Sequence, residues 1–235
     1  IGRTPIVPNP YALVAGRPVV LVGTTNEFAS SILGFEWAPN DCSWDFGDGE
    51  AATGCTASHV YTQCGSYVVS YSGTDGVATL STNVTVLVPC ELNVTNRGTR
   101  VQSRLNFAKT GLDSFSLTVF ADLGAGFSAS NQNVTVNFAD AEVAFQLDPR
   151  GNGRTKSGTC SLRYNRVSGL WTLTVNCRLG TWLSQWAQFG MTNETVGRPN
   201  RKIRAPVVVL VGNNVFAGER TLSYSSTLGR TGIAR

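Results

Sequence analysis

Short stretches in which apolar and polar residues alternate recur along the whole chain, and this pattern is typical of β-strands. In one of them, Tyr67, Val69 and Tyr71 would face one side of a sheet, while Val68 and Ser70 would face the other. Polar turns rich in Gly, Asn and Asp separate the stretches. In the second half of the chain the pattern predicts strands near residues 101–107, 112–122, 132–139, 141–148, 160–166, 170–178, 203–212 and 214–224. We therefore expect an all-β second domain, either a β-sandwich or a jelly-roll.

One segment departs from the strand pattern. Trp182 and Trp186 are four residues apart within residues 181–189, and this spacing predicts a short helix that plugs one end of the second domain. If they were exposed, Trp171, Trp182 and Trp186 would form a platform for sugar rings, because flat aromatic faces suit the apolar faces of pyranoses. The pattern favours the alternative, in which all three side chains belong to the core.

A hairpin is predicted around Ser168-Gly169, which suits a two-residue turn between the alternating segments 161–167 and 170–176. In that register Cys160 faces Cys177 at a non-hydrogen-bonded position, where the two backbones approach closely enough for a disulfide. We therefore expect a Cys160–Cys177 disulfide. The same register gives the hairpin an apolar face composed of Leu162, Tyr164, Trp171, Leu173 and Val175.

The N-terminal third carries a more specific signature. In Trp44-Asp45-Phe46-Gly47-Asp48-Gly49, a strand with a large aromatic residue runs into a tight turn. Gly47 and Gly49 suit left-handed backbone angles, and the carboxylates of Asp45 and Asp48 can accept hydrogen bonds from the free amides of the turn. Two shorter motifs follow, His59-Val60-Tyr61 and Gly65-Ser66-Tyr67. This order of motifs resembles the PKD (polycystic kidney disease) domain, an immunoglobulin-like β-sandwich of extracellular proteins.

The resemblance covers roughly Tyr11 to Pro89 and implies structural roles for its residues. It implies that Trp44 fills the core between two sheets, that His59 and Tyr61 lie at the entry to a following strand, and that Gly65 permits the turn before Tyr67. The family also implies adhesion, spacing or assembly outside the cell, and seldom chemistry. The expected organisation is an extended segment at residues 1–10, a PKD-like sandwich at 11–89, and a larger sandwich or jelly-roll at 90–235.

The remaining cysteines are Cys42, Cys55, Cys64 and Cys90, and they allow three connectivities. A Cys55–Cys64 bond is slightly favoured, because both residues lie at the same end of the expected sandwich. An even number of cysteines in a β-rich chain indicates an oxidising compartment. Zinc is the competing interpretation, but the sequence has no C-x-x-C motif and its single histidine already belongs to the PKD-like pattern.

Charge is divided unevenly between the two halves. Residues 1–89 carry two basic and seven acidic residues, a net charge of −5, whereas residues 90–235 carry 17 basic and 8 acidic residues, a net charge of +9. An acidic module joined to a basic one can attract copies of itself head to tail. Compositional drift between unrelated domains is the alternative. No apolar run approaches the length of a membrane span, and the start at Ile1 without a signal peptide suggests a processed product or an excised fragment.

Catalytic motifs are not found in the sequence. The single histidine, His59, has a structural role in the resemblance, which argues against a Ser-His-Asp or Cys-His centre. The sequence also contains no G-x-S-x-G motif and no phosphate-binding glycine loop. The sequence does not exclude a pair of carboxylates that would hydrolyse a glycosidic bond. Asp45 and Asp48 could bind calcium, although a role in stabilising their loop is favoured. We therefore expect a protein without enzymatic activity, cofactor or metal.

Four asparagines, Asn83, Asn93, Asn133 and Asn193, each begin an Asn-X-Thr sequence and could carry glycans. Four such sequences are about as many as chance predicts for this composition, so glycosylation stays an open possibility.

Two functions are compatible with these features. The first is an extracellular or cell-surface structural and adhesive protein, a self-assembling subunit of a surface layer or fibre whose main partners are copies of itself. The second is a carbohydrate-binding accessory module of a secreted hydrolase, which would bind surface glycans. We expect no nucleic-acid partner in either case.

The self-assembly hypothesis predicts particular docking residues. The first ten residues contain three prolines and the apolar pair Ile6-Val7, so they could lie along a sheet edge of the next subunit. Residues 227–235 likewise lack a hydrophobic face of their own. A basic loop is predicted that meets an acidic partner surface or an anionic glycan, or that is simply solvated; it comprises Arg198, Arg201, Lys202 and Arg204.

Overall fold

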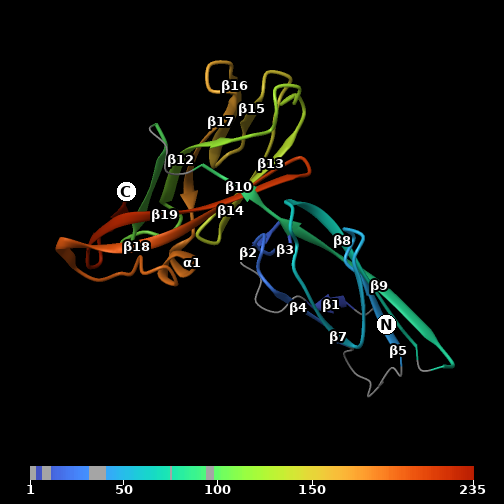
Figure 1. The fold of residues 1–235 in the computed structure, drawn as a ribbon. Coiled ribbons are helices and arrows are strands. Elements are labelled where there is room, and N and C mark those ends of the chain that lie inside the picture. The colour runs from blue at the N-terminus through green and yellow to red at the C-terminus, as the bar shows by residue number, and fades with distance from the viewer. Residues whose placement is uncertain (1–3, 7–11, 32–40, 75, 94–97) are drawn as a thin grey trace. The chain divides into compact units, whose positions relative to one another are not determined.

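Two compact units make up the chain, unit 1 at Ile1–Cys90 and unit 2 at Glu91–Arg235 (Figure 1). The computed structural model describes residues 4–6, 12–31, 41–74, 76–93 and 98–235. The elements of both units are β-strands, with one short helix in unit 2. The short strand β10 (Cys90–Glu91) lies at the boundary between the units.

Unit 1 is a sandwich of two sheets that enclose an aromatic core. Trp44 and Tyr71 come from one sheet and Phe28 from the other, and all three are buried. The ring of Trp44 lies 4.7 Å from that of Tyr71 and 6.0 Å from that of Phe28, as the resemblance implies for this tryptophan. The smaller sheet has the order β1 (Thr4–Ile6), β4 (Asn26–Ser31) and β7 (Thr56–His59). The larger sheet has the order β2 (Ala12–Val14), β3 (Arg17–Val19), β9 (Thr79–Val88), β8 (Gly65–Thr74), β5 (Asp41–Asp45) and β6 (Ala51–Thr53).

Two disulfides staple unit 1, Cys42–Cys55 and Cys64–Cys90. The slightly favoured Cys55–Cys64 bond is therefore wrong, because Cys42 at the start of β5 lies beside the loop that carries Cys55. The expected position of His59 and Tyr61 also needs correction. His59 ends β7 and Tyr61 follows it, whereas the next strand begins only at Gly65.

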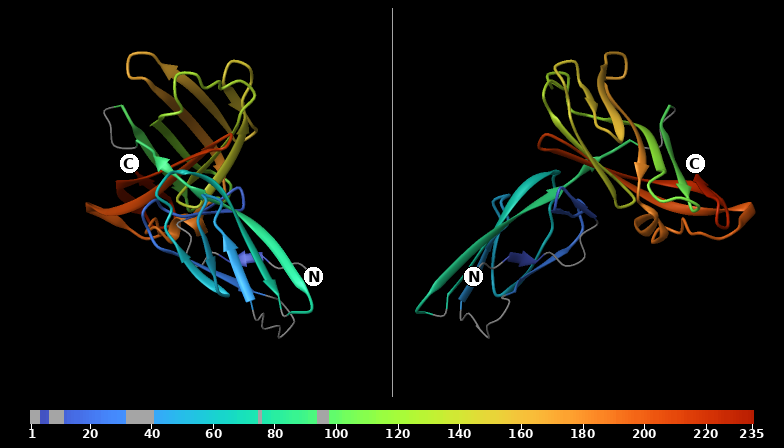
Figure 2. Two further views of the ribbon diagram at one scale, coloured as in Figure 1. Left: turned by 45° about the vertical axis from the view of Figure 1, so that its right-hand side comes forward. Right: turned by 180° about the vertical axis from the view of Figure 1, so that it is seen from behind.

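In unit 2 the described strands form one continuous, strongly curved sheet (Figures 1 and 2). Its order is β14 (Ala141–Gln146), β13 (Asn133–Phe138), β18 (Val196–Val211), β19 (Asn214–Thr227), β20 (Thr231–Ala234), β11 (Arg100–Asn106), β12 (Asp113–Ala121), β17 (Leu170–Gly180), β16 (Gly158–Asn165) and β15 (Asn152–Arg154). A bridge between Leu147 and Gly153 joins the two ends of the sheet. Unit 2 is therefore a nearly closed β-sandwich. The short strands β15 and β20 were not predicted from the sequence.

The predicted helix is present as α1 (Leu183–Ala187), and it inserts Trp186 into the core of unit 2. The Trp186 ring packs edge-on against Phe138 at 5.8 Å, and its indole N–H donates to the Phe138 carbonyl at 3.1 Å. Asp113, itself buried, fixes the start of the helix because its Oδ2 accepts the backbone N–H of Trp182 at 2.8 Å.

The register predicted for the hairpin of β16 and β17 is wrong by two residues. Asn165 pairs with Leu170, and its side-chain Oδ1 accepts the backbone N–H groups of Val167 and Ser168, which stabilises a four-residue connection in place of a two-residue turn. Cys160 consequently faces Val175, and Cys177 faces Gly158. Both cysteines are buried free thiols, so the expected Cys160–Cys177 disulfide is not formed. The predicted apolar face is nevertheless correct, since a shift of two residues keeps every side chain on its own face.

These two thiols give a direct test of the register. Burial raises the pKa of both Cys160 and Cys177 to about 12, so both stay protonated at neutral pH and react poorly. We expect N-ethylmaleimide to modify neither cysteine in the folded protein and both in denaturant without a reductant. Intact-mass spectrometry measures the number of adducts, and the four disulfide-bonded cysteines of unit 1 serve as a control that reacts only after reduction. An unmodified protein in denaturant would contradict this register.

The self-assembly hypothesis predicts that both terminal segments dock onto another subunit, and the described parts of both pair with strands of their own units. Ile6 lies in β1, whose backbone pairs with β4 of the same sandwich, opposite Ala29. Val7 lies outside the described residues. Near the other end of the sequence, β20 is held between β19 and β11, and Ala234 is fully buried. These strands already have pairing partners within their own units.

Candidate functional site

The PKD-motif turn holds its own carboxylates in structural hydrogen bonds. Oδ1 of Asp45 accepts the N–H of Gly47 at 2.8 Å, and Oδ1 of Asp48 accepts the N–H of Glu50 at 3.1 Å. The second oxygen of Asp48 lies 2.8 Å from Nε2 of His59. Among the described residues, no group of three or more His, Cys, Asp or Glu side chains is arranged to hold a metal ion. The carboxylates of this turn therefore stabilise the turn's own backbone and bind His59.

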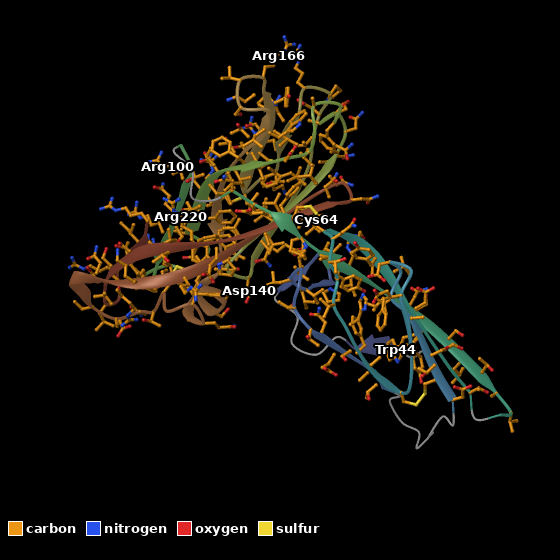
Figure 3. The ribbon with its side chains drawn as sticks, viewed as in Figure 1. Trp44, Cys64, Arg100, Asp140, Arg166 and Arg220 are labelled. Carbon is orange, nitrogen blue, oxygen red and sulfur yellow. A yellow bond between two sulfur atoms is a disulfide. The ribbon has the colours of Figure 1, made fainter. Side chains whose placement is uncertain are left out.

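An aromatic stack continues from this turn into unit 1. The ring of His59 lies parallel to that of Phe46 at 4.1 Å and meets Tyr61 edge-on at 4.5 Å. Tyr61 stacks in turn on Tyr67, and its hydroxyl donates to the Phe46 carbonyl at 3.1 Å. Burial, together with the nearby carboxylate of Asp48, raises the pKa of Tyr61 far above its usual value. The histidine of the motif is thus packed in a cluster of aromatic rings. Figure 3 labels Trp44, a residue of the same unit.

The tryptophans considered for sugar stacking do not form a platform. Trp186 is fully buried, and Trp171 is 7% exposed with its indole N–H donating to the Gly124 carbonyl at 2.9 Å. Of the three, only Trp182 is partly exposed, and its ring packs against that of Phe115 with the ring centres 5.1 Å apart. The alternative in which these side chains serve the core holds for Trp171 and Trp186.

The basic residues expected in a loop lie instead in β18, where other side chains bind Arg201, Lys202 and Arg204. Arg201 forms an ion pair with Glu194 at 2.6 Å. Lys202 donates to the Ser223 hydroxyl at 2.7 Å, and Arg204 pairs with Glu219. In the sequence this run is a cationic cluster, but in the structure Glu194 neutralises Arg201 and Glu219 neutralises Arg204.

Three of the four Asn-X-Thr asparagines are exposed. Asn83 lies in β9 and Asn133 begins β13, whereas Oδ1 of Asn193 accepts the N–H of Gly229 at 2.8 Å. Asn93 is half-buried, and its backbone bridges to Phe120.

A different set of cations, not recognised in the sequence, gathers on the outer face of unit 2. Two adjoining hollows of about 380 and 700 Å³ lie there, and both are lined by Asn176 and Cys177. Their volumes are in the range of ligand sites. Five of the lining residues are cationic: Arg104, Arg235, Arg154, Lys156 and Arg178. We call the two hollows together the cationic groove.

Strand pairing explains how these residues come together. The register places Gln102, Ser116, Asn176, Thr159 and Arg154 opposite one another in turn, on β11, β12, β17, β16 and β15. Residues opposite one another across paired strands share a face of the sheet. Their neighbours on the other face, such as Leu117, Val175 and Leu162, are buried. The groove thus lies on the polar face of a sheet whose other face forms the core.

The electrostatics of the groove differ from those of β18. The residues that line the two hollows include no Asp or Glu. Within the described part of the chain, ion pairs involve His59, Arg201 and Arg204 but none of the five groove cations. All five groove cations are exposed. Arg100, Arg166 and Arg220, labelled in Figure 3, are further cations of the same unit. The groove can therefore attract an anionic ligand from solvent.

Comparison with known proteins identifies the N-terminal unit. A family model described as "PKD domain" matches residues 8–88, so this part of the chain is a PKD domain. No curated protein matches the chain significantly. Among solved structures, the chain is similar to one titled "Structural basis for the promiscuous specificity of the carbohydrate-binding modules from the beta-sandwich super family". That similarity has 12% identity and a TM-score of 0.31, and it covers 99% of this chain and 96% of the other.

The PKD domain and the two disulfides are features of secreted or extracellular proteins. Among the described residues, the structure contains no helix of the length and apolar character needed to cross a membrane.

Proposed function

We propose that this protein is an extracellular, non-catalytic binding protein that attaches to an acidic polysaccharide through the cationic groove of unit 2. The observation that carries the proposal is the contrast between two sets of cations. Arg201 and Arg204 are neutralised by glutamates of their own unit, whereas the groove cations have no acidic residue in the surrounding lining. A cationic surface left without internal partners is suited to an external anion.

The chemistry of the lining favours a polysaccharide over other polyanions. The planar guanidinium of arginine matches carboxylate and sulfate groups in a bidentate manner, and four of the five cations are arginines. Between them lie hydroxyl and amide side chains, among them Ser116, Asn176 and Thr159, which can bind sugar hydroxyls. The only aromatic side chain of the lining, Phe115, is buried, so the groove offers no stacking surface for nucleic-acid bases.

The same lining supports a binding role without catalysis. General acid–base cleavage of a glycosidic bond requires a pair of carboxylic groups. Neither Asp, Glu nor His lines the two hollows. In this proposal the PKD domain serves as a rigid, disulfide-stapled spacer outside the cell, the role that its family implies.

Titration with an acidic polysaccharide, such as a sulfated or uronic-acid polymer, tests the proposal against a neutral polymer of equal length. We expect binding only to the acidic polymer, with an affinity that falls as salt is added. Replacing Arg154, Lys156 and Arg178 by Gln should weaken binding about 100-fold, at roughly 1 kcal/mol for each lost charged contact.

The matched control replaces two cations that are already paired. Arg201→Gln together with Arg204→Gln removes the same kind of charge from the same unit but should change affinity by no more than about two-fold. Equal losses in both variants, or equal binding of the neutral polymer, would overturn the proposal.

Self-assembly is a second candidate, favoured by the outer face of the larger sheet in unit 1. That face exposes Asp41, Ser43 and Asp45 on β5 beside Ser70 on β8, and unit 1 has Arg17 as its one described cation. An acidic face of this kind could enter the cationic groove of a second copy and produce a head-to-tail chain. Light scattering of the ligand-free protein in the same experiments distinguishes the candidates, because only assembly gives a mass that grows with protein concentration.

A further inference from the structure

We infer that the cationic groove contains two separate anion subsites joined by an uncharged polar row, and that it selects a linear polyanion lying across the strands. The inference rests on the proposed function and specifies the length and direction of its ligand. It follows from how the five cations are distributed between the two hollows, three in one and two in the other.

The first subsite is the larger hollow, with Arg154, Lys156 and Arg178 in its lining. Two hydrogen bonds hold these cations at the same end of the groove. The N–H of Thr155 donates to the Gly158 carbonyl at 2.9 Å, which closes the turn that carries Lys156. The N–H of Arg178 donates to the Ser157 carbonyl at 2.7 Å, which ties β17 to that turn.

The second subsite is the smaller hollow, with Arg104 and Arg235 in its lining. Arg104 lies on β11 opposite Ile233 of β20. The backbone of Arg235 is fixed by two hydrogen bonds with Ser223, at 2.8 and 3.2 Å. Arg104 therefore projects from a strand and Arg235 from the residue that follows one, although the two are far apart in the sequence.

An uncharged row connects the two subsites. It contains Gln102, Ser116, Asn176 and Thr159 and ends at Arg154, so it crosses five adjacent strands. Adjacent strands lie about 4.8 Å apart, so Arg104 on β11 is about 10 Å from Arg178 on β17, two strands away, and about 19 Å from Arg154 on β15, four strands away. A ligand that contacts cations of both subsites must be at least about 10 Å long, must carry anions near both ends, and must run across the strands.

Two linked subsites produce a characteristic dependence on ligand length. An anionic oligosaccharide shorter than about 10 Å reaches only one subsite, so two molecules can bind to each protein. A longer one occupies both subsites, and its second contact forms at a high effective concentration. Affinity should then rise by at least about 10-fold over a narrow range of lengths, and the stoichiometry should fall from two ligands to one.

Isothermal titration calorimetry with a length series of one acidic oligosaccharide tests this inference. Arg104→Gln with Arg235→Gln removes the second subsite, and Arg154→Gln with Arg178→Gln removes the first. For a short oligosaccharide, either double variant should bind one ligand in place of two. For a long one, either should weaken binding at least about 10-fold without changing the stoichiometry.

The outcomes separate this inference from the function on which it rests. A stoichiometry of one at every length, or an affinity that rises smoothly with length, overturns the two-subsite arrangement and leaves acidic-polysaccharide binding in place. Failure of every acidic oligosaccharide and polymer to bind overturns both. Equal binding of duplex DNA or of polyglutamate with the same length dependence would show that the groove recognises spaced anions without selecting a polysaccharide.

Discussion

Reduction of the two disulfides should lower the free energy of unfolding of unit 1 by about 6 kcal/mol and leave that of unit 2 unchanged. The bonds Cys42–Cys55 and Cys64–Cys90 close loops with sequence separations of 13 and 26 residues. Restricting the unfolded chain by loops of these sizes contributes about 3 and 3.5 kcal/mol. A small domain is stable by about 5–15 kcal/mol in total, so this loss is a large share of the stability of unit 1. Unit 2 contains only free cysteines.

Hydrogen–deuterium exchange resolved by peptide measures this difference within a single molecule. With reductant, amides of the unit 1 core such as Val69 and Tyr71 should lose protection, while those around Val136 in unit 2 should keep it. Replacing each disulfide separately by two alanines should show the larger loss for Cys64–Cys90, which closes the longer loop. Equal loss of protection in both units would contradict the assignment of the two bonds to unit 1.

Local motifs allowed the PKD domain to be predicted from the sequence. Trp44, Asp45, Gly47 and Asp48 are close together in the chain, and their roles depend on one turn and on the strand before it. A short window of sequence therefore contains nearly all the information that this turn requires. The helix around Trp186 could be predicted for the same reason, since the spacing of Trp182 and Trp186 belongs to a single element.

Strand register lies beyond what alternation can specify. The pattern around Cys160 and Cys177 correctly assigns each residue to a face, because faces repeat every two residues. A register shifted by two residues satisfies the same pattern. The choice between the two depended on the side chain of Asn165, which closes a longer turn than Ser168-Gly169 alone suggested.

The cationic groove could not be predicted for a different reason. Its cations come from separate strands and the turns beside them, and only the order of strands in the sheet brings Arg104, Arg178 and Arg235 together. The run of Arg201 and Arg204 is contiguous in the sequence and was therefore easier to notice, but Glu194 and Glu219 neutralise it. The available signal was weaker: β11 and β12 alternate buried apolar residues with Ser, Gln and Arg, and acidic residues are few.

Replacing Gly47 by Ala should destabilise unit 1 by about 3 kcal/mol or more, whereas replacing Gly49 by Ala should cost about 1 kcal/mol. Both glycines belong to the PKD-motif turn, and both have left-handed backbone angles, with φ of +79° and +96°. An alanine at either position would therefore have a similar conformational free-energy cost. The two sites differ in the space available. A Cβ on Gly47 would lie 2.7 Å from the carbonyl oxygen of Val68 and 3.0 Å from its nitrogen, whereas a Cβ on Gly49 would have no neighbour within 4 Å.

The close neighbour of Gly47 is backbone in the middle of β8, so it cannot move without disturbing its pairing with β9. Overpacking of this kind typically costs a further 1–3 kcal/mol or so. Urea titration of the two variants, with exchange protection at Val69 as the readout for unit 1, measures the difference. Since Gly49→Ala shares the turn, the backbone angle and the added methyl group, it isolates the contact with Val68. Equal destabilisation by the two variants would mean that backbone angle alone selects glycine in this turn, and that its close packing on β8 contributes nothing.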